Sequence, residues 1–186
     1  SRKIHTQLKS SGVIKRILRD LNAARELLKP VDPVFDETFK STDMDYHFSQ
    51  PFNNDIFMSY RAYRMNYYAV TGLMARVCRF TRDSVNAFKY AKEIIDAAAE
   101  GSFRFTPEGD FTASLEKRDV VMQNELLFAL NCPDIQDIYY SVDATPSNRL
   151  SLLEVDNIYG EASDFRRYLI GKSTISDRPI TYKYAR

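Results

Sequence analysis

The sequence predicts a mainly α fold that is organised around a hairpin of two helices between residues 60 and 99. In each half of this stretch, apolar residues recur every three or four positions, which is typical of amphipathic helices. The first set is Tyr60, Tyr63, Tyr67, Val70, Met74, Val77 and Cys78, and the second is Val85, Phe88, Ala91, Ile95 and Ala98. Only residues 81–84 separate the two patterns, and so short a break predicts antiparallel helices.

Small residues mark the predicted contact between the two helices. Ala75 and Ala87 lie 12 positions apart, which is the spacing of the two small packing positions in a tetratricopeptide repeat. Met74 and Ile94 would then supply bulk around the contact. We therefore expect tetratricopeptide-like helical hairpins, an α-α superhelix, with long loops and a few short strands.

An earlier helix is expected at residues 4–28, where apolar residues keep helical spacing apart from an interruption at residues 10–12. This helix should end at Lys29, because the residue before Pro30 is disfavoured in the helical region. Its basic row, within residues 15–19, is interpreted as a solvated face, because acidic residues share the helix and the net charge is only +1.

The segment between the first helix and the hairpin is rich in Pro, Asp, Thr and Ser, and residues 31–54 are expected to form a loop. The helix pair should then occupy residues 55–100. One of Asn53, Asn54 and Asp55 would cap its first helix through a side-chain oxygen.

Residues 101–186 are expected to be a loop-rich region with short strands, so that the chain forms one incomplete domain. Glu100 and Gly101 should end the preceding helix. Asp164 is expected to pair locally with Arg166 or Arg167. The further elements expected are a short strand or extended edge at 103–105, a polar connection at 106–117, a strand or buried extended piece at 125–131, an irregular stretch at 133–151 and a strand at 180–184.

Four strings of the chain resemble, in the same order, segments of the SusD/RagB family, the surface glycan-binding lipoproteins of Bacteroidetes outer membranes. They are residues 13–30, 60–99, 125–131 and 159–170, and the most specific part reads RMNYYAVTGLMARVCRFTRDSVNAFKYAKEIIDAA. Where the family usually has Gly before the Asp of the turn, this chain has Arg82. Arg82 must therefore adopt a left-handed conformation, or the turn is built differently.

The resemblance implies a non-enzymatic protein at the surface of the outer membrane, without metal or cofactor. It would capture an oligosaccharide or polysaccharide and pass it to a SusC-like TonB-dependent transporter. Neither Cys78 nor Cys132 lies in a lipobox, so the lipid anchor of the family is absent here and we expect a fragment from the middle of the family fold. Uncovered repeat surface should then make the fragment associate with itself or with the missing part.

Candidate ligand-binding residues cluster in the stretch expected to be irregular. Tyr139 and Tyr140 stand near Asp137, Asn148 and Arg149. Sugar sites combine flat aromatic faces with polar side chains that pair the hydroxyls. Aromatic and polar residues are equally expected in a loop that packs on a core, so a structural role stays open.

The sequence offers little support for other classes of function. The 26 Lys and Arg balance 25 Asp and Glu, which gives no footprint for nucleic acid. No phosphate-binding glycine motif and no nucleophile elbow is present. Asp43, Asp45 and His47 alternate as metal ligands do, but the Gly and the closing Glu of a calcium loop are missing. The alternative from another class is a helical-repeat scaffold that binds protein partners without binding sugar.

Overall fold

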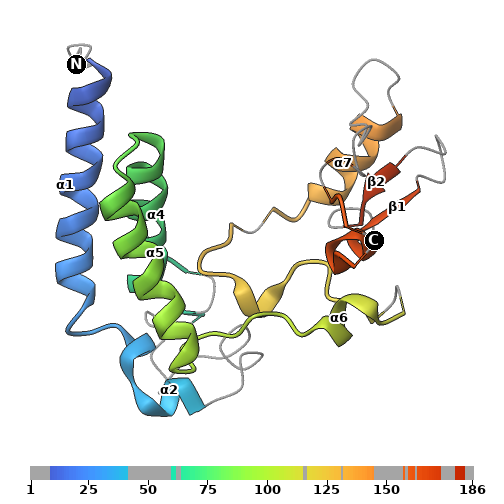
Figure 1. Ribbon diagram of the computed structural model, residues 1–186, viewed down its shortest axis with the longest axis horizontal. Coiled ribbons are helices and arrows are strands. Elements are labelled where there is room, and N and C mark those ends of the chain that lie inside the picture. Colours follow the sequence, from blue (N-terminus) through green and yellow to red (C-terminus); the bar gives the residue numbers. More distant parts are fainter. Residues whose placement is uncertain are drawn as a thin grey trace. The chain divides into compact units, whose positions relative to one another are not determined.

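The computed structural model describes residues 9–41, 60–61, 64–114, 117–130, 132–144, 157, 159–161, 163–172 and 179–182. Over these residues the chain is mainly helical, as predicted (Figure 1). It divides into two compact units. The helical unit comprises Ser1–Arg104 and Leu126–Leu130, and the C-terminal unit comprises Phe105–Glu125 and Asn131–Arg186.

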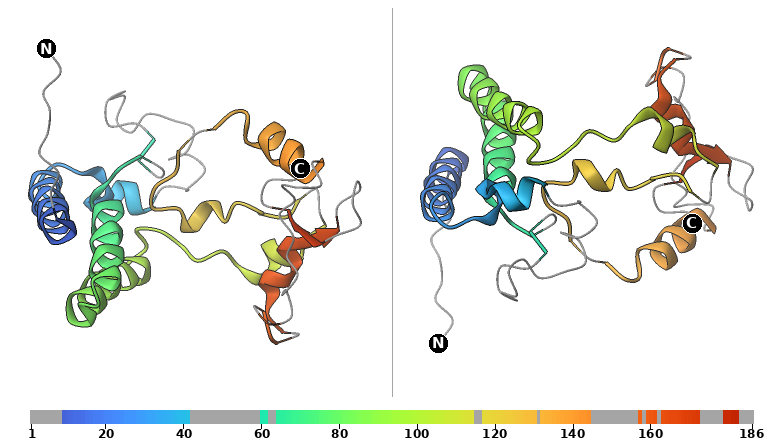
Figure 2. Two further views of the ribbon diagram at one scale, coloured as in Figure 1. Left: turned by 90° about the horizontal axis from the view of Figure 1, so that it is seen from above. Right: turned by 90° about the horizontal axis from the view of Figure 1, so that it is seen from below.

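Three longer helices dominate the helical unit: α1 (Ser10–Leu28), α4 (Tyr67–Phe80) and α5 (Ser84–Ala99). Helices α4 and α5 pack against each other as an antiparallel hairpin, which confirms the central prediction, and α1 packs against α4 (Figures 1 and 2). Two short elements, η1 (Pro33–Phe35) and α2 (Glu37–Ser41), follow α1.

Helix α1 ends at Leu28 as predicted, but the expected interruption at residues 10–12 is wrong, because the helix begins there. The amides of Gly12 and Val13 bond the carbonyl of Lys9, at 2.8 and 3.1 Å, and so form the first turn. A glycine costs a helix only about 1 kcal/mol relative to alanine, which the following apolar residues offset by packing.

Helix α4 begins at Tyr67, 12 residues later than the predicted start at residue 55. Its N-cap is Asn66, whose side-chain oxygen accepts from the amide of Ala69 at 2.8 Å. Tyr60 has a φ of 59°, a left-handed conformation that no α-helix continues through. The residues predicted as caps, 53–55, lie outside the described part of the chain.

The sequence left open whether Arg82 adopts a left-handed conformation or the turn between α4 and α5 is built differently. Arg82 has a φ of 63°, so it adopts the left-handed conformation that a glycine would take without strain. Asp83 then caps α5, accepting from the amide of Asn86 at 3.1 Å. At the other end of α5, Glu100 is the C-cap and Gly101 has a φ of 90°, as predicted.

The predicted loop at residues 31–54 in fact supplies part of the core. Val34 of η1 and Phe39 of α2 are buried in one cluster with Tyr67, Tyr68, Ala97 and Phe103, and Leu127 packs against that cluster. The apolar residues are too few and too irregularly spaced to produce a periodic signal, yet burial orders the short turns around them.

The C-terminal unit contains short elements only: α6 (Glu108–Thr112), η3 (Gln123–Glu125), α7 (Ile135–Ala144), η4 (Phe165–Leu169), β1 (Ile170–Lys172) and β2 (Pro179–Thr181). Strands β1 and β2 are antiparallel, with Gly171 opposite Ile180. This pairing confirms the start of the strand predicted at 180–184. Phe111, Val120 and Leu169 form the core, and Asp164 pairs with Arg166 as predicted, at 2.6 Å.

Between residues 103 and 151 two expected strands do not form, and two further expectations are wrong. Phe103 is buried and Phe105 exposed, which gives strand-like alternation, but residues 103–105 and 125–130 are not strands. Among the described residues, no neighbouring strand completes a ladder with them. The polar connection at 106–117 contains α6, which buries Phe111. The irregular stretch at 133–151 contains α7, whose Ile135, Ile138 and Val142 keep helical spacing.

Candidate functional site

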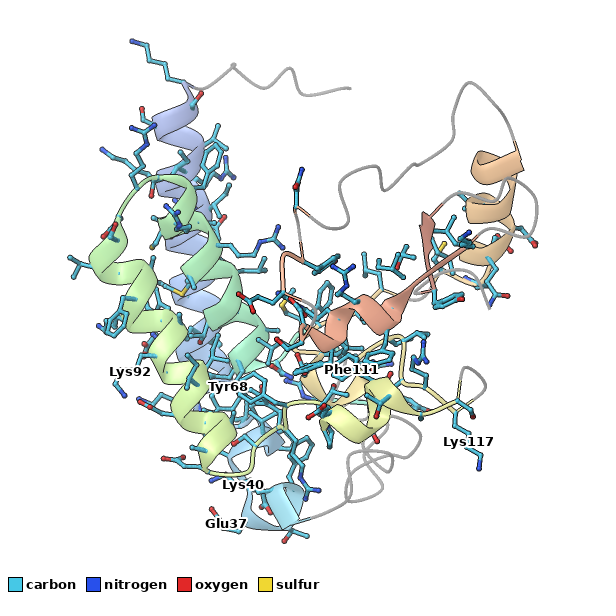
Figure 3. The ribbon with its side chains drawn as sticks, turned by 45° about the vertical axis from the view of Figure 1, so that its right-hand side comes forward. Glu37, Lys40, Tyr68, Lys92, Phe111 and Lys117 are labelled. Carbon is cyan, nitrogen blue, oxygen red and sulfur yellow. The ribbon has the colours of Figure 1, made fainter. Side chains whose placement is uncertain are left out.

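A groove of about 690 Å³ opens between α5, the end of α1 and η1, all within the helical unit. It is called the aromatic groove here, and it combines aromatic, basic and acidic side chains. Figure 3 shows Lys92 projecting from α5 and Tyr68 at the start of α4. The lining residues are Lys29, Phe35, Tyr67, Tyr68, Val85, Phe88, Lys89, Lys92, Glu93, Asp96, Ala97 and Glu100.

A three-residue network fixes the wall of the aromatic groove. The guanidinium of Arg25 in α1 donates to both carboxylate oxygens of Glu93 in α5 and to the hydroxyl of Tyr67 in α4, each at 2.5 Å. The Tyr67 hydroxyl in turn donates to Glu93 at 2.7 Å. Arg25 also lies over the rings of Tyr67 and Tyr90. One residue from each long helix is thereby held in a single geometry.

The network changes the acidity of the tyrosine at its centre. Burial, together with the hydrogen bond to the Glu93 carboxylate, raises the pKa of Tyr67 to about 12. The phenol therefore stays protonated and keeps donating to Glu93 throughout the physiological range. The Glu93 carboxylate thus has its charge balanced by Arg25 and one lone pair occupied by Tyr67.

A buried ion pair supports the start of α4. Arg61 donates to both carboxylate oxygens of Asp32, at 3.2 and 2.6 Å, and Asp32 also accepts from the amide of Tyr67 at 2.7 Å. Both side chains are buried. Such a bidentate pair has fixed geometry, so it sets the direction in which Tyr67 and Tyr68 leave the backbone.

The aromatic residues of the groove divide into packed and accessible ones. Phe35 packs edge-on against Tyr67, with ring centroids 4.8 Å apart, and Tyr68 packs against Phe103. The rings of Tyr67 and Tyr68 are buried, whereas Phe88 is 70% exposed. An exposed ring beside Lys92, which pairs with Asp96 at 2.7 Å, offers a stacking face together with donors and acceptors for hydroxyl groups.

The ligand-binding residues predicted from the sequence lie apart from this groove in the chain. Asp137, Tyr139 and Tyr140 belong to α7 of the C-terminal unit, and Asp137 is exposed. They stand on a helix and not in the irregular loop that was predicted. Asn148 and Arg149 lie outside the described residues, so their part in binding stays a prediction, as does that of the two tyrosines.

The residues predicted for helix-pair packing all belong to α4 and α5. Met74 has no exposed surface, and Ile94 is partly buried against the core cluster. A Cβ placed on Gly72 would lie 3.5 Å from Ile94 and 3.4 Å from Leu127, so both side chains cover that glycine closely. Ala75 and Ala87 line one shared surface groove of about 470 Å³. Their tetratricopeptide role stays a prediction.

Sequence reasoning missed Arg25, Glu93, Asp32 and Arg61. A signal existed for Arg25, because it occupies a position of helical spacing between Leu21 and Leu28 in α1, where an apolar residue is expected. A charged residue at such a position needs a partner. Asp32 gave no such signal, since it lies outside the periodic segments, and Arg61 gave none because it is not one of the positions where apolar residues recur.

Cys78 is buried in α4, and burial raises the pKa of its thiol, as expected for a structural cysteine. The described residues contain no cluster of three or more His, Cys, Asp or Glu side chains suited to a metal ion. In the same part of the chain, no helix combines the length and apolar character that crossing a membrane requires.

Comparison of the chain with protein-family models, curated proteins and solved structures found no match.

Proposed function

We propose that this chain belongs to a surface nutrient-binding protein of the SusD-like kind, which captures an oligosaccharide and passes it to a SusC-like TonB-dependent transporter. The observation that carries the proposal is the mutual packing of three strings that resemble the family. Arg25 of the first string (13–30) bonds Tyr67 and Glu93 of the second string (60–99). Leu127 of the third string (125–131) packs against the core cluster that contains Tyr67. Segments of a tetratricopeptide-like superhelix are expected to pack in this way.

The aromatic groove supports capture of a polyhydroxylated ligand. Phe88 offers an exposed ring for the apolar face of a pyranose, and Lys92, Asp96 and Glu100, which follow it along α5, line the same groove with donors and acceptors. The fixed network of Arg25, Tyr67 and Glu93 keeps the wall of the groove rigid, which lowers the entropic cost of binding. Tyr139 and Tyr140 of α7 are the second place where sugar is proposed to bind.

Calorimetric titration of the chain against a panel of polysaccharides tests the proposal. We expect at least one saturable ligand, bound about tenfold more weakly by Phe88→Ala or by Tyr139→Ala with Tyr140→Ala. Phe80→Ala is the matched control, because Phe80 is 81% exposed on α4 and does not line the aromatic groove. If glycans bind and none of these variants matters, the site assignment is wrong, and if no glycan binds, the proposal fails.

A helical-repeat scaffold that binds protein partners is the second candidate function. One observation favours it: Val85, Phe88 and Ile95 form an apolar stripe along α5 and are 79%, 70% and 57% exposed. Exposed apolar stripes of this kind mark protein interfaces. The scaffold is preferred if the folded chain binds none of the polysaccharides.

A further inference from the structure

One end of the helical unit carries a strong excess of positive charge. This end, called the basic end here, consists of the first half of α1, the second half of α4 and the first half of α5, residues 9–20 and 73–90. It holds eight Lys and Arg residues against two Asp. The other described residues of the helical unit hold seven basic and seven acidic residues. The net charge of only +1 for the whole chain therefore conceals an uneven distribution of charge within the helical unit.

Arg19 of the basic end pairs with Asp20 at 2.8 Å, but three arginines near the α4–α5 turn have no such partner within the part of the chain that the structure describes. Arg76, Arg79 and Arg82 have no carboxylate within ion-pair distance among those residues. The nearby Asp83 is engaged as the cap of α5, where it bonds the amide and the side chain of Asn86. As far as the described residues show, these three guanidinium groups are available to an external anion.

Two apolar grooves open at the same end. One, of about 570 Å³, lies between α1 and α4 and is lined by Val13, Ile17 and Phe80. The other, of about 470 Å³, lies between α4 and α5 over Ala75, Ala87 and Ala91. Arg76 lines both grooves. Phe80 is 81% exposed, so the charge is interleaved with uncovered apolar surface.

We propose that the basic end binds an acidic amphipathic helix of a partner protein. The apolar face of that helix, with residues at i, i+3, i+4 and i+7, fills the grooves, and its flanking carboxylates face Arg76 and Arg79. The concave shape selects this partner over a lipid surface. Each groove lies between two helices and accepts individual side chains, which a fluid bilayer does not present.

The proposal goes beyond sugar capture and does not rest on it. A labelled synthetic helix with a Leu stripe at this spacing and Glu on its flanks serves as the probe. Its binding to the whole chain is followed by fluorescence anisotropy at low and high salt. The comparison probes are a Lys-flanked helix with the same Leu stripe, a scrambled Glu peptide and phosphatidylserine-containing vesicles.

Arg76→Glu with Arg79→Glu is expected to weaken binding of the acidic helix about tenfold or more, and added salt should weaken binding to the wild type. Phe80→Ser is expected to weaken it several-fold. Arg104→Glu and Leu27→Ser are the matched controls, because both change exposed residues outside the basic end. Circular dichroism establishes that every variant folds.

Three results would overturn the proposal: no binding of the acidic helix, equal binding of the Lys-flanked or scrambled peptide, or indifference to the arginine variants. Binding to the vesicles in place of the helix would overturn it in favour of a lipid surface. Self-association of the chain that prevents the probe from binding would overturn the proposal in favour of a second copy of this chain as the occupant of the grooves. Sugar binding, measured on the same variants, should be unchanged, so the two proposals fail independently.

Discussion

The guanidinium of Arg25 in α1 lies 2.5 Å from the carboxylate of Glu93 in α5, although 68 positions separate the two residues in the sequence. Helices α1 and α5 each also interact with α4, by packing and through Tyr67. The pair therefore closes a ring of contacts among the three long helices. Both side chains are largely buried, with 16% and 31% of their surface exposed, so their interaction is screened less than a surface pair.

Loss of either partner should destabilise the helical unit, because the other charge is then left without its counter-ion in a partly buried site. We expect Arg25→Met or Glu93→Gln to lower the free energy of unfolding by about 1–3 kcal/mol. Urea denaturation followed by circular dichroism measures this change. The double variant should cost less than the sum of the two single variants, since the pair is lost only once.

Lys92→Ala provides the matched control on the same helix. Lys92 pairs with Asp96 at 2.7 Å, but both side chains are more than half exposed, and such pairs contribute at most about 0.5 kcal/mol. Two results would contradict the stabilising role given to the Arg25–Glu93 pair. One is that Lys92→Ala lowers the free energy of unfolding as much as Glu93→Gln does, and the other is that the effects of Arg25→Met and Glu93→Gln are strictly additive.

The stability of the chain should fall in alkali because of Tyr67. An unfolded tyrosine loses its proton near pH 10, whereas the pKa of Tyr67 in the folded chain is about 12. Between these values the unfolded state binds fewer protons, so the free energy of unfolding decreases as pH rises. The contribution is fully present below pH 10 and is lost by about pH 12, an effect on the order of 2 kcal/mol.

Tyr67→Phe isolates this contribution. At neutral pH the variant should be less stable by about 1–2 kcal/mol, because Glu93 loses a buried donor. Between pH 10 and 12 its stability should fall less steeply than that of the wild type. Parallel curves for the two proteins would show that Tyr67 does not hold its proton in the way the network implies.

The hairpin could be predicted because its information is local. Apolar spacing identifies α4 and α5, and the short break between them dictates an antiparallel return. Arg82 was identified in another way, because it stands where the SusD/RagB family that the chain resembles usually has Gly. The late start of α4 was not predictable, because Tyr60 continues the apolar spacing while its φ of 59° prevents the helix.

The aromatic groove could not be predicted because it depends on tertiary contacts. Arg25, Tyr67 and Glu93 come from three helices, and nothing in a single segment indicates that they meet. Asp32 and Arg61 are a stronger case. Asp32 lies in a stretch without periodicity, Arg61 precedes the observed start of α4, and other elements of the fold bury both side chains. The sequence suggested a sugar site in the stretch at 133–151, because adjacent tyrosines can be recognised in a sequence, whereas a groove cannot.

The two cysteines should differ sharply in reactivity. Cys132 is exposed, while Cys78 is buried and has a raised thiol pKa, and the thiolate is the reactive form. Titration of the native chain with a thiol reagent should modify one cysteine rapidly, and the second only at the rate of local or global opening. Cys132→Ser should abolish the rapid phase, and a rapid phase that persists in this variant would show that Cys78 is accessible.

Replacing Arg82 by glycine should stabilise the chain. Arg82 holds a φ of 63°, which costs a residue with a side chain about 1–2 kcal/mol, whereas glycine adopts it freely. Part of that gain is lost, because glycine also makes the unfolded chain more flexible. The expected net increase in the free energy of unfolding is about 0.5–1 kcal/mol, measured by urea denaturation. Arg76→Gly, inside α4, should instead cost about 1 kcal/mol. A destabilising Arg82→Gly would mean that the arginine side chain contributes contacts that outweigh its backbone strain.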